Sequence, residues 1–276
     1  GARLLSLDCF DTLLWRDVHA PADLFAGLGD ITPQHRIRAE HAARKRRALA
    51  RHRSGEVTLR EIYAELLPHA DEATRAAAMA AEVALEMRHC YAFAPTVALI
   101  REAKARGLPV VIVSDTYFEH EQLQALIRAA AGDDVLAMID RIFSSCEHRS
   151  AKGERLFKIV MRDVRVRAED ILHIGDNRNA DGVAANRDGL TGVHLVQFGE
   201  TTVQRLRQEA ATAAMMLPHG PAFMPHRAAL AVGEPMLGEN VNPEITQKLL
   251  EKYGYDKPLG EQYINYLKGL FTGDMG

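Results

Sequence analysis

From residue 92 onward the chain alternates short apolar runs with amphipathic helical segments, and this repetition limits the folds it can adopt. The clearest run, PVVIVS at 109–114, is continuously apolar and β-branched, which is typical of a strand buried on both faces. Other strand-like runs are RLLSLD at 3–8, RIFSS at 141–145, ILHIG at 171–175 and GVHLVQF at 192–198. Repeated strand–helix units require parallel strands joined by right-handed crossovers. We therefore predict an α/β fold with a doubly wound, Rossmann-like parallel sheet.

One long stretch interrupts this repetition after the first strand. Residues 19–91 are rich in Ala, Arg, Leu and Glu at helical spacing, without strand-like alternation. Thr58 and Glu61 have the spacing of a capping box, which predicts the start of a helix there. We predict an all-helical insertion over 19–91, so that the sheet domain comprises residues 1–18 and 92–200.

The use of basic residues changes towards the end of the chain. All 26 arginines and four of the eight lysines lie in residues 1–235, whereas residues 236–276 hold four lysines and no arginine. We predict a helix and linker over 201–235 and a helical tail over 236–276. The tail is either a separate module joined from another source or an ordinary C-terminal extension.

Composition narrows the choice of compartment and partner. A formal net charge of -3 argues against a nucleic-acid partner. Three widely spaced cysteines form neither a disulfide framework nor a zinc pattern, which fits a reducing cytoplasm. No apolar run approaches the ~18 residues of a membrane helix, and no signal peptide precedes the first strand. We expect a cytoplasmic protein without a membrane partner.

Polar residues stand where several predicted strands end. Asp8, Ser114 and Asp176 follow or close apolar runs, Lys152 lies just past another, and Asp181 comes five residues after Asp176. Ligands of open parallel sheets bind beyond these strand ends. Clustered carboxylates need a cation, and oxygen ligands suit Mg²⁺, whereas a lysine and a serine suit a phosphoryl group. The pattern predicts phosphoryl transfer with a carboxylate nucleophile and Mg²⁺.

Four segments in this order resemble the motifs of the haloacid dehalogenase (HAD) superfamily: LLSLDCFDTLL, VVIVSD, SAKGERLF and HIGDNRNAD. The resemblance covers residues 3 to 200, and the helical insertion is similar to that family's cap. It implies a hydrolase that cleaves a small phosphate ester through an aspartyl-phosphate. The motifs DxFDTLL, EVTLREIY and SDTY are similar to a branch in which some members are attached to glycosyltransferases. We therefore also expect that this chain could be fused to, or associate with, a glycosyltransferase-type domain.

The resemblance also implies roles for residues of the first and fourth motifs. Asp8 would be the nucleophile and a metal ligand, and the backbone carbonyl of Phe10 would bind Mg²⁺. Asp176 would be a further ligand, and Asp181 would bind the ion or orient a water on it. Thr12 would fix the turn after the first strand and touch the general-acid position.

The second and third motifs imply substrate contacts. Ser114 would donate a hydrogen bond to the phosphoryl group, and Lys152 would keep Asp8 ionised and stabilise the phosphoryl oxygens. Asp115 is assigned to substrate binding or, together with Thr116, to the N-cap of the next helix.

One position departs from the family pattern. Phosphatases of the family carry a second aspartate two residues after the nucleophile as general acid and base, and this chain has Phe10 there. General acid–base catalysis of this kind raises the reaction rate by about 10²–10⁴-fold. Asp11 could replace it, although a hydrogen bond within the turn is an alternative role for Asp11. A cap residue could also serve, or the leaving group could need little protonation.

Two other functions compete with the phosphohydrolase. Dehalogenases of the family also have an aromatic residue at this position and use no metal, which favours a metal-independent dehalogenase-type hydrolase. The acidic pair in GDNRNAD favours the metal-dependent reaction instead. The third hypothesis is a HAD-like binding or regulatory module with little turnover.

Other features receive simpler interpretations. The segment 36–53 carries eight basic residues against Glu40, and is either a solvated cap face or a surface that steers anionic substrates. Cys9 is interpreted as a packed thiol, and His173 as a core residue rather than a ligand. The last 35 residues resemble a segment of oligopeptide ABC transporter permeases, but without a membrane span, so we do not infer transport.

Overall fold

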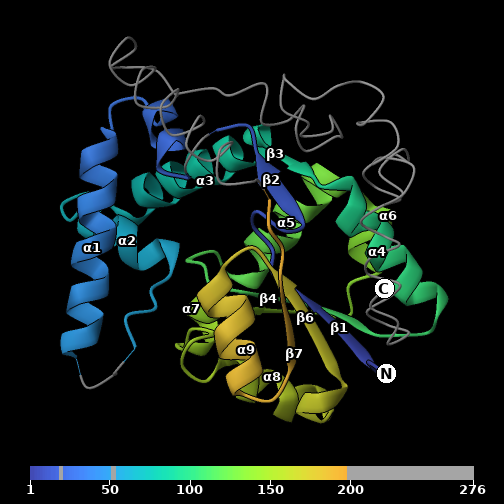
Figure 1. The fold of residues 1–276 in the computed structure, drawn as a ribbon. Helices are drawn as coiled ribbons and strands as arrows, with labels where there is room; N and C mark the ends of the chain where they lie inside the picture. Colours follow the sequence, from blue (N-terminus) through green and yellow to red (C-terminus); the bar gives the residue numbers. More distant parts are fainter. Residues whose placement is uncertain (19–20, 51–53, 198–276) are drawn as a thin grey trace, which may run out of the picture.

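The computed structural model describes residues 1–18, 21–50 and 54–197, and a parallel sheet lies at its centre (Figure 1). The five strands run in the order β5-β4-β1-β6-β7, and every neighbouring pair is parallel. They are β1 (Leu4–Leu7), β4 (Val110–Ser114), β5 (Arg141–Ser144), β6 (Ile171–Gly175) and β7 (Thr191–His194). The predicted α/β fold with a doubly wound parallel sheet is confirmed.

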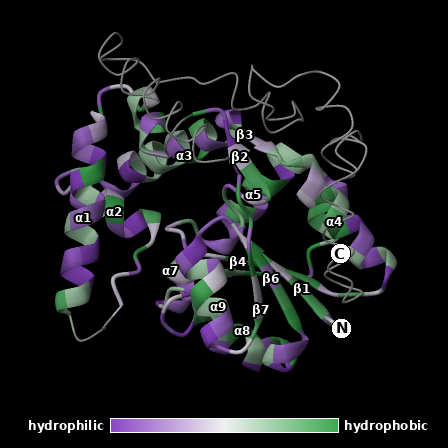
Figure 2. Cartoon of the chain, in the orientation of Figure 1, coloured by the Kyte–Doolittle hydropathy of each residue, from purple (hydrophilic) through white to green (hydrophobic). Residues whose placement is uncertain are grey.

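Helices cover both faces of this sheet. Alternate residues of a strand point to opposite faces, and in β1 Leu5 belongs to one core cluster whereas Leu4 belongs to another. The first cluster includes residues of α4 (Ala94–Ala105) and α5 (His120–Ala131), and the second includes residues of α8 (Leu156–Val164) and α9 (Ala184–Arg187). The central strands β1, β4 and β6 are accordingly buried throughout and mostly apolar (Figure 2). Shorter elements are α6 (Asp133–Ala137), α7 (Ser145–His148), η2 (Ala168–Asp170) and η3 (Arg178–Val183).

The insertion forms a cap of helices beside the sheet domain (Figure 1). Its elements are η1 (Pro21–Gly27), α1 (Pro33–Leu49), α2 (Leu59–Leu66) and α3 (Glu72–His89). The predicted capping box is present at the start of α2, where the Thr58 N–H donates to Glu61 Oε2 at 2.8 Å and Thr58 Oγ1 accepts from the Glu61 N–H at 3.3 Å.

The insertion is not entirely helical, which corrects the prediction for its C-terminal boundary. Strand β2 (Leu14–Arg16) pairs antiparallel with β3 (Cys90–Ala92), and together they join the entrance and exit of the cap. Strands of three residues are too short to show a two-residue alternation in the sequence. Trp15 stacks on Phe93 beside this ribbon, with ring centroids 4.3 Å apart.

Two arginines are buried against α3. Glu82 and Glu86 lie four residues apart on this helix, and each binds one arginine through two oxygens: Arg36 with Glu82, and Arg16 with Glu86. Arg36 is fully buried, so the interpretation of 36–53 as a solvated face is wrong for its first residue. Burial of a charged pair requires this kind of complete hydrogen bonding.

Some predictions fall beyond these elements. The helix and linker at 201–235 and the helical tail at 236–276 lie outside the described residues. Within the described part of the chain, no helix combines the length and the apolar character needed to cross a membrane.

Candidate active site

The polar residues predicted at the strand ends meet at one edge of the sheet. Asp8 follows β1, Ser114 closes β4 and Asp176 follows β6, and these three strands are neighbours. With Lys152 they line a pocket of about 370 Å³. The opposite wall includes Glu40 and Arg44 of α1, so the pocket lies between the sheet domain and the cap.

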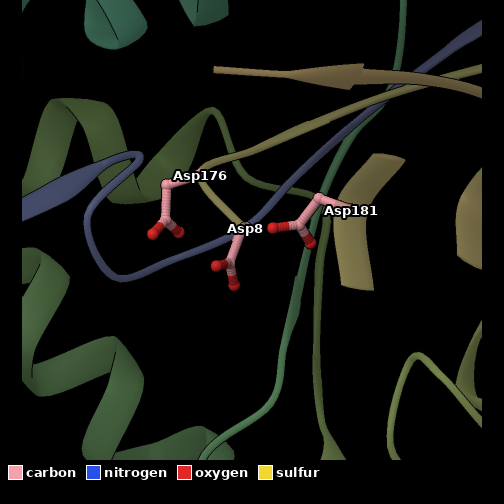
Figure 3. Close-up of side chains that lie close together, drawn as sticks. All are labelled: Asp8, Asp176 and Asp181. Carbon is pink, nitrogen blue, oxygen red and sulfur yellow. The ribbon is translucent and has the colours of Figure 1, made fainter. Parts of the chain in front are cut away.

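Three carboxylates converge in this pocket. Oxygens of Asp8, Asp176 and Asp181 lie within 4.8 Å of one another, and Figure 3 shows the other two carboxylates on either side of Asp8. Burial, followed by the charges of Asp8, Asp11 and Asp181, raises the pKa of Asp176 to about 8. Burial also raises the pKa of Asp8. The close packing of these buried carboxylates thus disfavours their ionised forms, and a bound cation would favour those forms.

Lys152 is the ammonium that partly offsets this charge. The side chain is buried, and Nζ lies 3.1 Å from Asp8 Oδ1 and 2.5 Å from Asp181 Oδ1. Burial acts to lower the pKa of Lys152, but the surrounding carboxylates, Asp8 first among them, outweigh it and raise the pKa. A permanently charged ammonium beside Asp8 favours the ionised, nucleophilic form of that carboxylate.

Asp181 is held by more donors than the sequence suggested. Its Oδ1 accepts from Lys152 Nζ and lies 3.0 Å from His173 Nε2, while Oδ2 accepts from the Asn177 N–H at 2.9 Å. Burial would raise the pKa of Asp181, but Lys152 and His173 lower it. Most acceptor positions of this carboxylate are therefore filled by protein groups. Of the two predicted roles, this geometry favours orienting a ligating water over direct coordination.

His173 is a core residue, as predicted, but it also belongs to this network. The ring is fully buried in β6, and Nδ1 lies 2.8 Å from Ser6 Oγ. Nε2 faces the Asp181 carboxylate, so the ring connects Ser6 of β1 with Asp181. Gly175 leaves room for the arrangement, because a Cβ there would collide with Asp181.

The turn after β1 is fixed to the fourth motif. Thr12 is buried, its Oγ1 accepts from the Asp176 N–H at 3.1 Å, and its carbonyl accepts from Thr96 Oγ1. Thr12 therefore positions Asp176 as well as the turn. Cys9 is a buried thiol whose pKa is raised well above its ordinary value by burial and by Asp8, which supports the interpretation as a packed residue.

An aromatic ring and a buried arginine occupy the region beside Asp8. Phe10 lines the pocket, and the Arg16 guanidinium carbon lies 4.1 Å from the centroid of its ring. Arg16 Nη1 also lies 3.7 Å from a carboxylate oxygen of Asp11. Asp11 has a left-handed backbone (φ 54°), and its N–H donates to the Leu14 carbonyl, so Asp11 does hydrogen-bond the turn.

The N-cap interpretation of Asp115 and Thr116 is wrong. The next helix, α5, begins later and is capped by Glu119 with Gln122. Asp115 Oδ1 instead accepts from the Lys152 N–H at 2.9 Å, and Thr116 Oγ1 accepts from the Phe118 N–H. Asp115 and Ser114 both line the pocket, where the substrate contacts predicted for them remain predictions.

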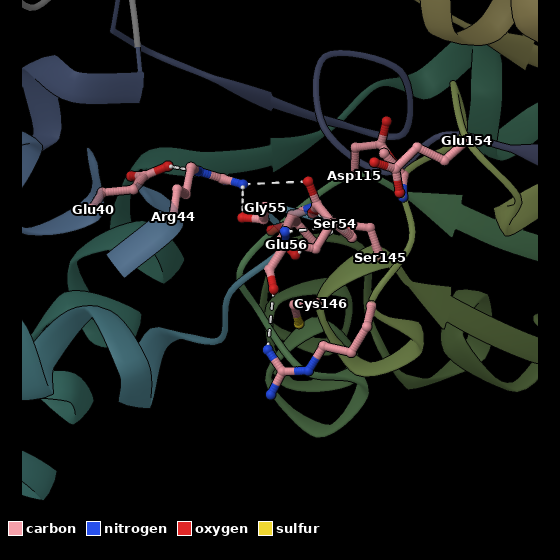
Figure 4. Close-up of polar contacts among 12 residues, drawn as sticks. Glu40, Arg44, Ser54, Gly55, Glu56, Asp115, Ser145, Cys146 and Glu154 are labelled. Atoms are coloured by element: carbon pink, nitrogen blue, oxygen red, sulfur yellow. Dashed lines mark hydrogen bonds and ion pairs between the residues drawn. The ribbon is translucent and has the colours of Figure 1, made fainter. Parts of the chain in front are cut away.

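Loop residues connect the cap to the sheet domain (Figure 4). Arg44 Nε donates to Glu40 at 3.0 Å, and its Nη1 donates to Glu56 at 3.3 Å. Ser145 Oγ donates to the other oxygen of Glu56 at 2.5 Å, and the Arg149 guanidinium donates to the Glu56 carbonyl. Glu56 is thus shared between the cap helix α1 and the sheet domain.

The residues present fit a divalent cation. Asp8 and Asp176 offer hard carboxylate oxygens of the kind that Mg²⁺ prefers, and Asp181 lies beside them. Burial and the neighbouring carboxylates raise the pKa of Asp176, and a cation bound between the carboxylates would oppose this rise.

The haloacid dehalogenase-like hydrolase family matches residues 3–187, which include all four motifs. The chain belongs to this family. The expectation of an enzyme, a hydrolase, is thereby confirmed. No curated protein matches this HAD-like hydrolase, and the permease resemblance of the last 35 residues has no support.

Several solved structures share the fold. An L-2-haloacid dehalogenase from Xanthobacter autotrophicus, with chloropropionic acid covalently bound, is 17% identical, with a TM-score of 0.53 over 87% of this chain and 92% of that one. A 2-haloacid dehalogenase from Pseudomonas syringae pv. tomato is 15% identical (TM-score 0.52, 72% and 89% covered). A HAD family enzyme from Bacteroides thetaiotaomicron is 14% identical (TM-score 0.53, 74% and 98% covered). At these identities the similarity concerns the fold.

The structure adds pocket residues of this HAD-like hydrolase that sequence reasoning missed. Arg16, Arg44 and Glu40 line the pocket, and His173 supports it from β6. A signal existed for two of them, since Arg16 and His173 are polar residues inside apolar runs (LLWR and ILHIG) next to motifs. A buried polar residue in such a run needs a partner.

Proposed function

We propose that this HAD-like hydrolase cleaves a small phosphate ester in a Mg²⁺-dependent reaction, with Asp8 as the nucleophile. The observation that carries the proposal is the cluster of Asp8, Asp176 and Asp181 around one lysine. A cluster with this excess of negative charge suits a site whose charge is balanced by a cation. Asp8 and Asp176 would hold the ion, which would neutralise charge between the carboxylates and an anionic substrate.

The residues of the pocket suit a two-step displacement. Asp8 Oδ attacks phosphorus, the bond to the leaving oxygen breaks, and an aspartyl-phosphate forms. Lys152 keeps Asp8 ionised and stabilises the phosphoryl oxygens, while the Ser114 hydroxyl donates to one of them. Water then attacks phosphorus and releases phosphate, which restores the Asp8 carboxylate.

A second candidate is a metal-independent dehalogenase-type hydrolase, and the comparisons favour it over the first. Two of the similar structures are named haloacid dehalogenases, and Phe10 occupies the position two residues after the nucleophile, where a phosphatase would need an acid. Here Asp8 would attack the carbon that bears the halogen, halide would leave, and water would hydrolyse the resulting ester. The carboxylate cluster argues against this candidate, because without a metal ion the carboxylates would repel the negatively charged halide that leaves.

Paired assays decide between the candidates. Phosphate release from 4-nitrophenyl phosphate and chloride release from 2-chloropropionate are measured with Mg²⁺ and with a chelator. We expect phosphate release that requires Mg²⁺ and is lost in Asp8→Asn, with no chloride release. Chloride release that persists in the chelator and is lost in Asp8→Asn would replace the first candidate by the second.

A further inference from the structure

The part of the pocket away from Asp8 must receive the leaving group of a substrate. In-line displacement places the nucleophile and the leaving oxygen on opposite sides of phosphorus. Besides Asp8 and Asp176, the described carboxylates that line the pocket are Asp11, Glu40 and Asp115. A carboxylic proton for the leaving oxygen would have to come from one of these groups.

Each of these carboxylates already has a cationic or N–H partner. Asp11 lies 3.7 Å from the Arg16 guanidinium, and Glu40 binds Arg44 at 3.0 Å. Asp115 faces the pocket, and its Oδ1 accepts from the Lys152 N–H at 2.9 Å. Cations and N–H donors favour the charged form of a carboxylate, and that form has no proton to donate.

Arg16 supplies fixed positive charge in the same region. It is 4% exposed, and Glu86 holds it through Nε and Nη2, each 3.0 Å from a carboxylate oxygen. The guanidinium also lies over Phe10, which occupies the position expected for a general acid. A guanidinium keeps its protons at neutral pH, but it stabilises developing negative charge, and a preorganised donor does so most effectively.

We propose that the substrate is a phosphorylated compound whose leaving group departs as a stabilised, unprotonated oxyanion, with Arg16 stabilising that negative charge. Acyl phosphates and phosphoanhydrides have such leaving groups. For an acyl phosphate, Asp8 forms the new bond to phosphorus and the acyl oxygen keeps the electron pair, so a carboxylate leaves without a proton. Water then hydrolyses the aspartyl-phosphate and releases its proton to solvent. This inference rests on the proposed phosphohydrolase and narrows its substrate class.

The first test uses the unmodified protein with Mg²⁺ and two compounds of nearly equal size, acetyl phosphate and ethyl phosphate. Without a proton donor, kcat/KM for ethyl phosphate should be lower by at least about 10²–10⁴-fold, the usual contribution of general acid catalysis. Values within about tenfold of each other would overturn the inference. Pyrophosphate represents the phosphoanhydrides. Comparing kcat/KM for pyrophosphate with kcat/KM for acetyl phosphate shows which of the two substrate classes, phosphoanhydrides or acyl phosphates, the enzyme prefers.

The second test replaces Arg16. Arg16→Lys keeps the positive charge but loses the paired N–H donors of the guanidinium. The double variant Arg16→Gln, Glu86→Gln removes the ion pair without leaving a buried carboxylate unpaired. Across 4-nitrophenyl, phenyl and ethyl phosphate, the loss of kcat/KM should grow as the leaving group becomes more basic, up to about 10²–10³-fold. A structural defect would lower all three rates equally, and that result would overturn the role of Arg16.

Asp11→Asn tests the main alternative. If Asp11 were the acid, this variant would lose activity on ethyl phosphate selectively, and the inference would be wrong. If ethyl and acetyl phosphate are hydrolysed equally well, only the inference fails, whereas the absence of phosphate release from every compound removes the proposed function too.

Discussion

Two walls of one pocket are built in different ways. The rim (Asp8, Ser114, Lys152 and Asp176 in the pocket, with Asp181 beside them) stands on the ends of parallel strands and the loops after them. The cap wall (Glu40 and Arg44) belongs to helix α1 of the inserted cap, and Arg44 also binds Glu56 of a cap loop. Apart from Lys152, the first wall is held by short side chains and backbone N–H groups, and the second by long side chains that bind one another.

Positions in the rim are therefore strongly constrained. Asp8 accepts from the Cys9 N–H, the Asp176 N–H donates to Thr12, and Asp181 accepts from the Asn177 N–H. Groups anchored to the backbone near their own Cα lose little conformational entropy when they act. A rim of this kind suits a chemical step that requires fixed distances.

The cap wall has more freedom to change partners. Arg44 is one-third exposed and shares its guanidinium between Glu40 and Glu56, and Glu56 is shared in turn with Ser145. Exposed or half-exposed ion pairs are individually weak. We infer that the rim governs the rate of the chemical step, whereas the cap wall governs how tightly a substrate binds.

The largest effect is expected for Lys152→Met. The substitution keeps the length of a buried side chain but removes the ammonium between Asp8 and Asp181. We expect kcat to fall by about 10²–10³-fold, and thermal unfolding to occur at a lower temperature because two buried carboxylates lose their partner. Steady-state kinetics and calorimetry measure the two effects.

Lys158→Met is the matched control for this lysine. Lys158 lies on α8 with its side chain 62% exposed, and its nearest acidic partner, Asp188, is 4.0 Å away. We expect kcat and the unfolding temperature to stay close to those of the unmodified protein. If Lys152→Met changed kcat no more than this control, the rim would lose its assigned role.

Sequence reasoning predicted the rim well for a physical reason. Asp8, Ser114 and Asp176 occupy strand ends, and the topology of a parallel sheet brings strand ends together whatever lies between them. The same reasoning missed β2 and β3, because a pair of three-residue strands carries no periodic signal. Sequence reasoning also placed a helix cap at Asp115, where the side chain instead binds the loop that holds Lys152. A polar residue after a strand has the same sequence pattern in both cases.

The cap wall was beyond sequence reasoning. Arg44 is one of several arginines along α1, and only the packing of that helix decides that Arg36 is buried, that Arg44 lines the pocket and that Arg46 faces solvent. The partners of Glu56 come from segments far away in the chain, so no local spacing could reveal them. Helical spacing predicted the cap helices, but not which charged residues turn inward.

A smaller effect is expected for Arg44→Met, and this variant tests the comparison from the side of the cap. Losing the guanidinium should raise KM by up to about tenfold through weaker ion pairing, with kcat nearly unchanged. Arg46→Met is the control on the same helix, because Arg46 is 78% exposed, pairs with Glu65 and does not line the pocket. A fall in kcat for Arg44→Met as large as that for Lys152→Met would abolish the distinction between the two walls.

The smallest effect concerns the contact between cap and sheet domain at Glu61. Its carboxylate accepts from the Thr58 N–H and binds Arg149 and Arg47. Burial would raise the pKa of Glu61, but these partners outweigh it and lower the pKa below its ordinary 4.5. A carboxyl with a lowered pKa in the folded state contributes stability above the ordinary value, and loses it as the pH falls through the folded-state value.

Glu61→Gln should therefore reduce the free energy of unfolding by about 1 kcal/mol at neutral pH, the typical worth of a helix cap with partly exposed ion pairs. The difference from the unmodified protein should shrink as the pH falls below 4.5, because the native carboxyl then becomes protonated. Urea unfolding of both proteins at a series of pH values measures this difference in unfolding free energy. A difference that stays constant or grows towards acid pH would show that the charge of Glu61 does not stabilise the contact between the cap and the sheet domain.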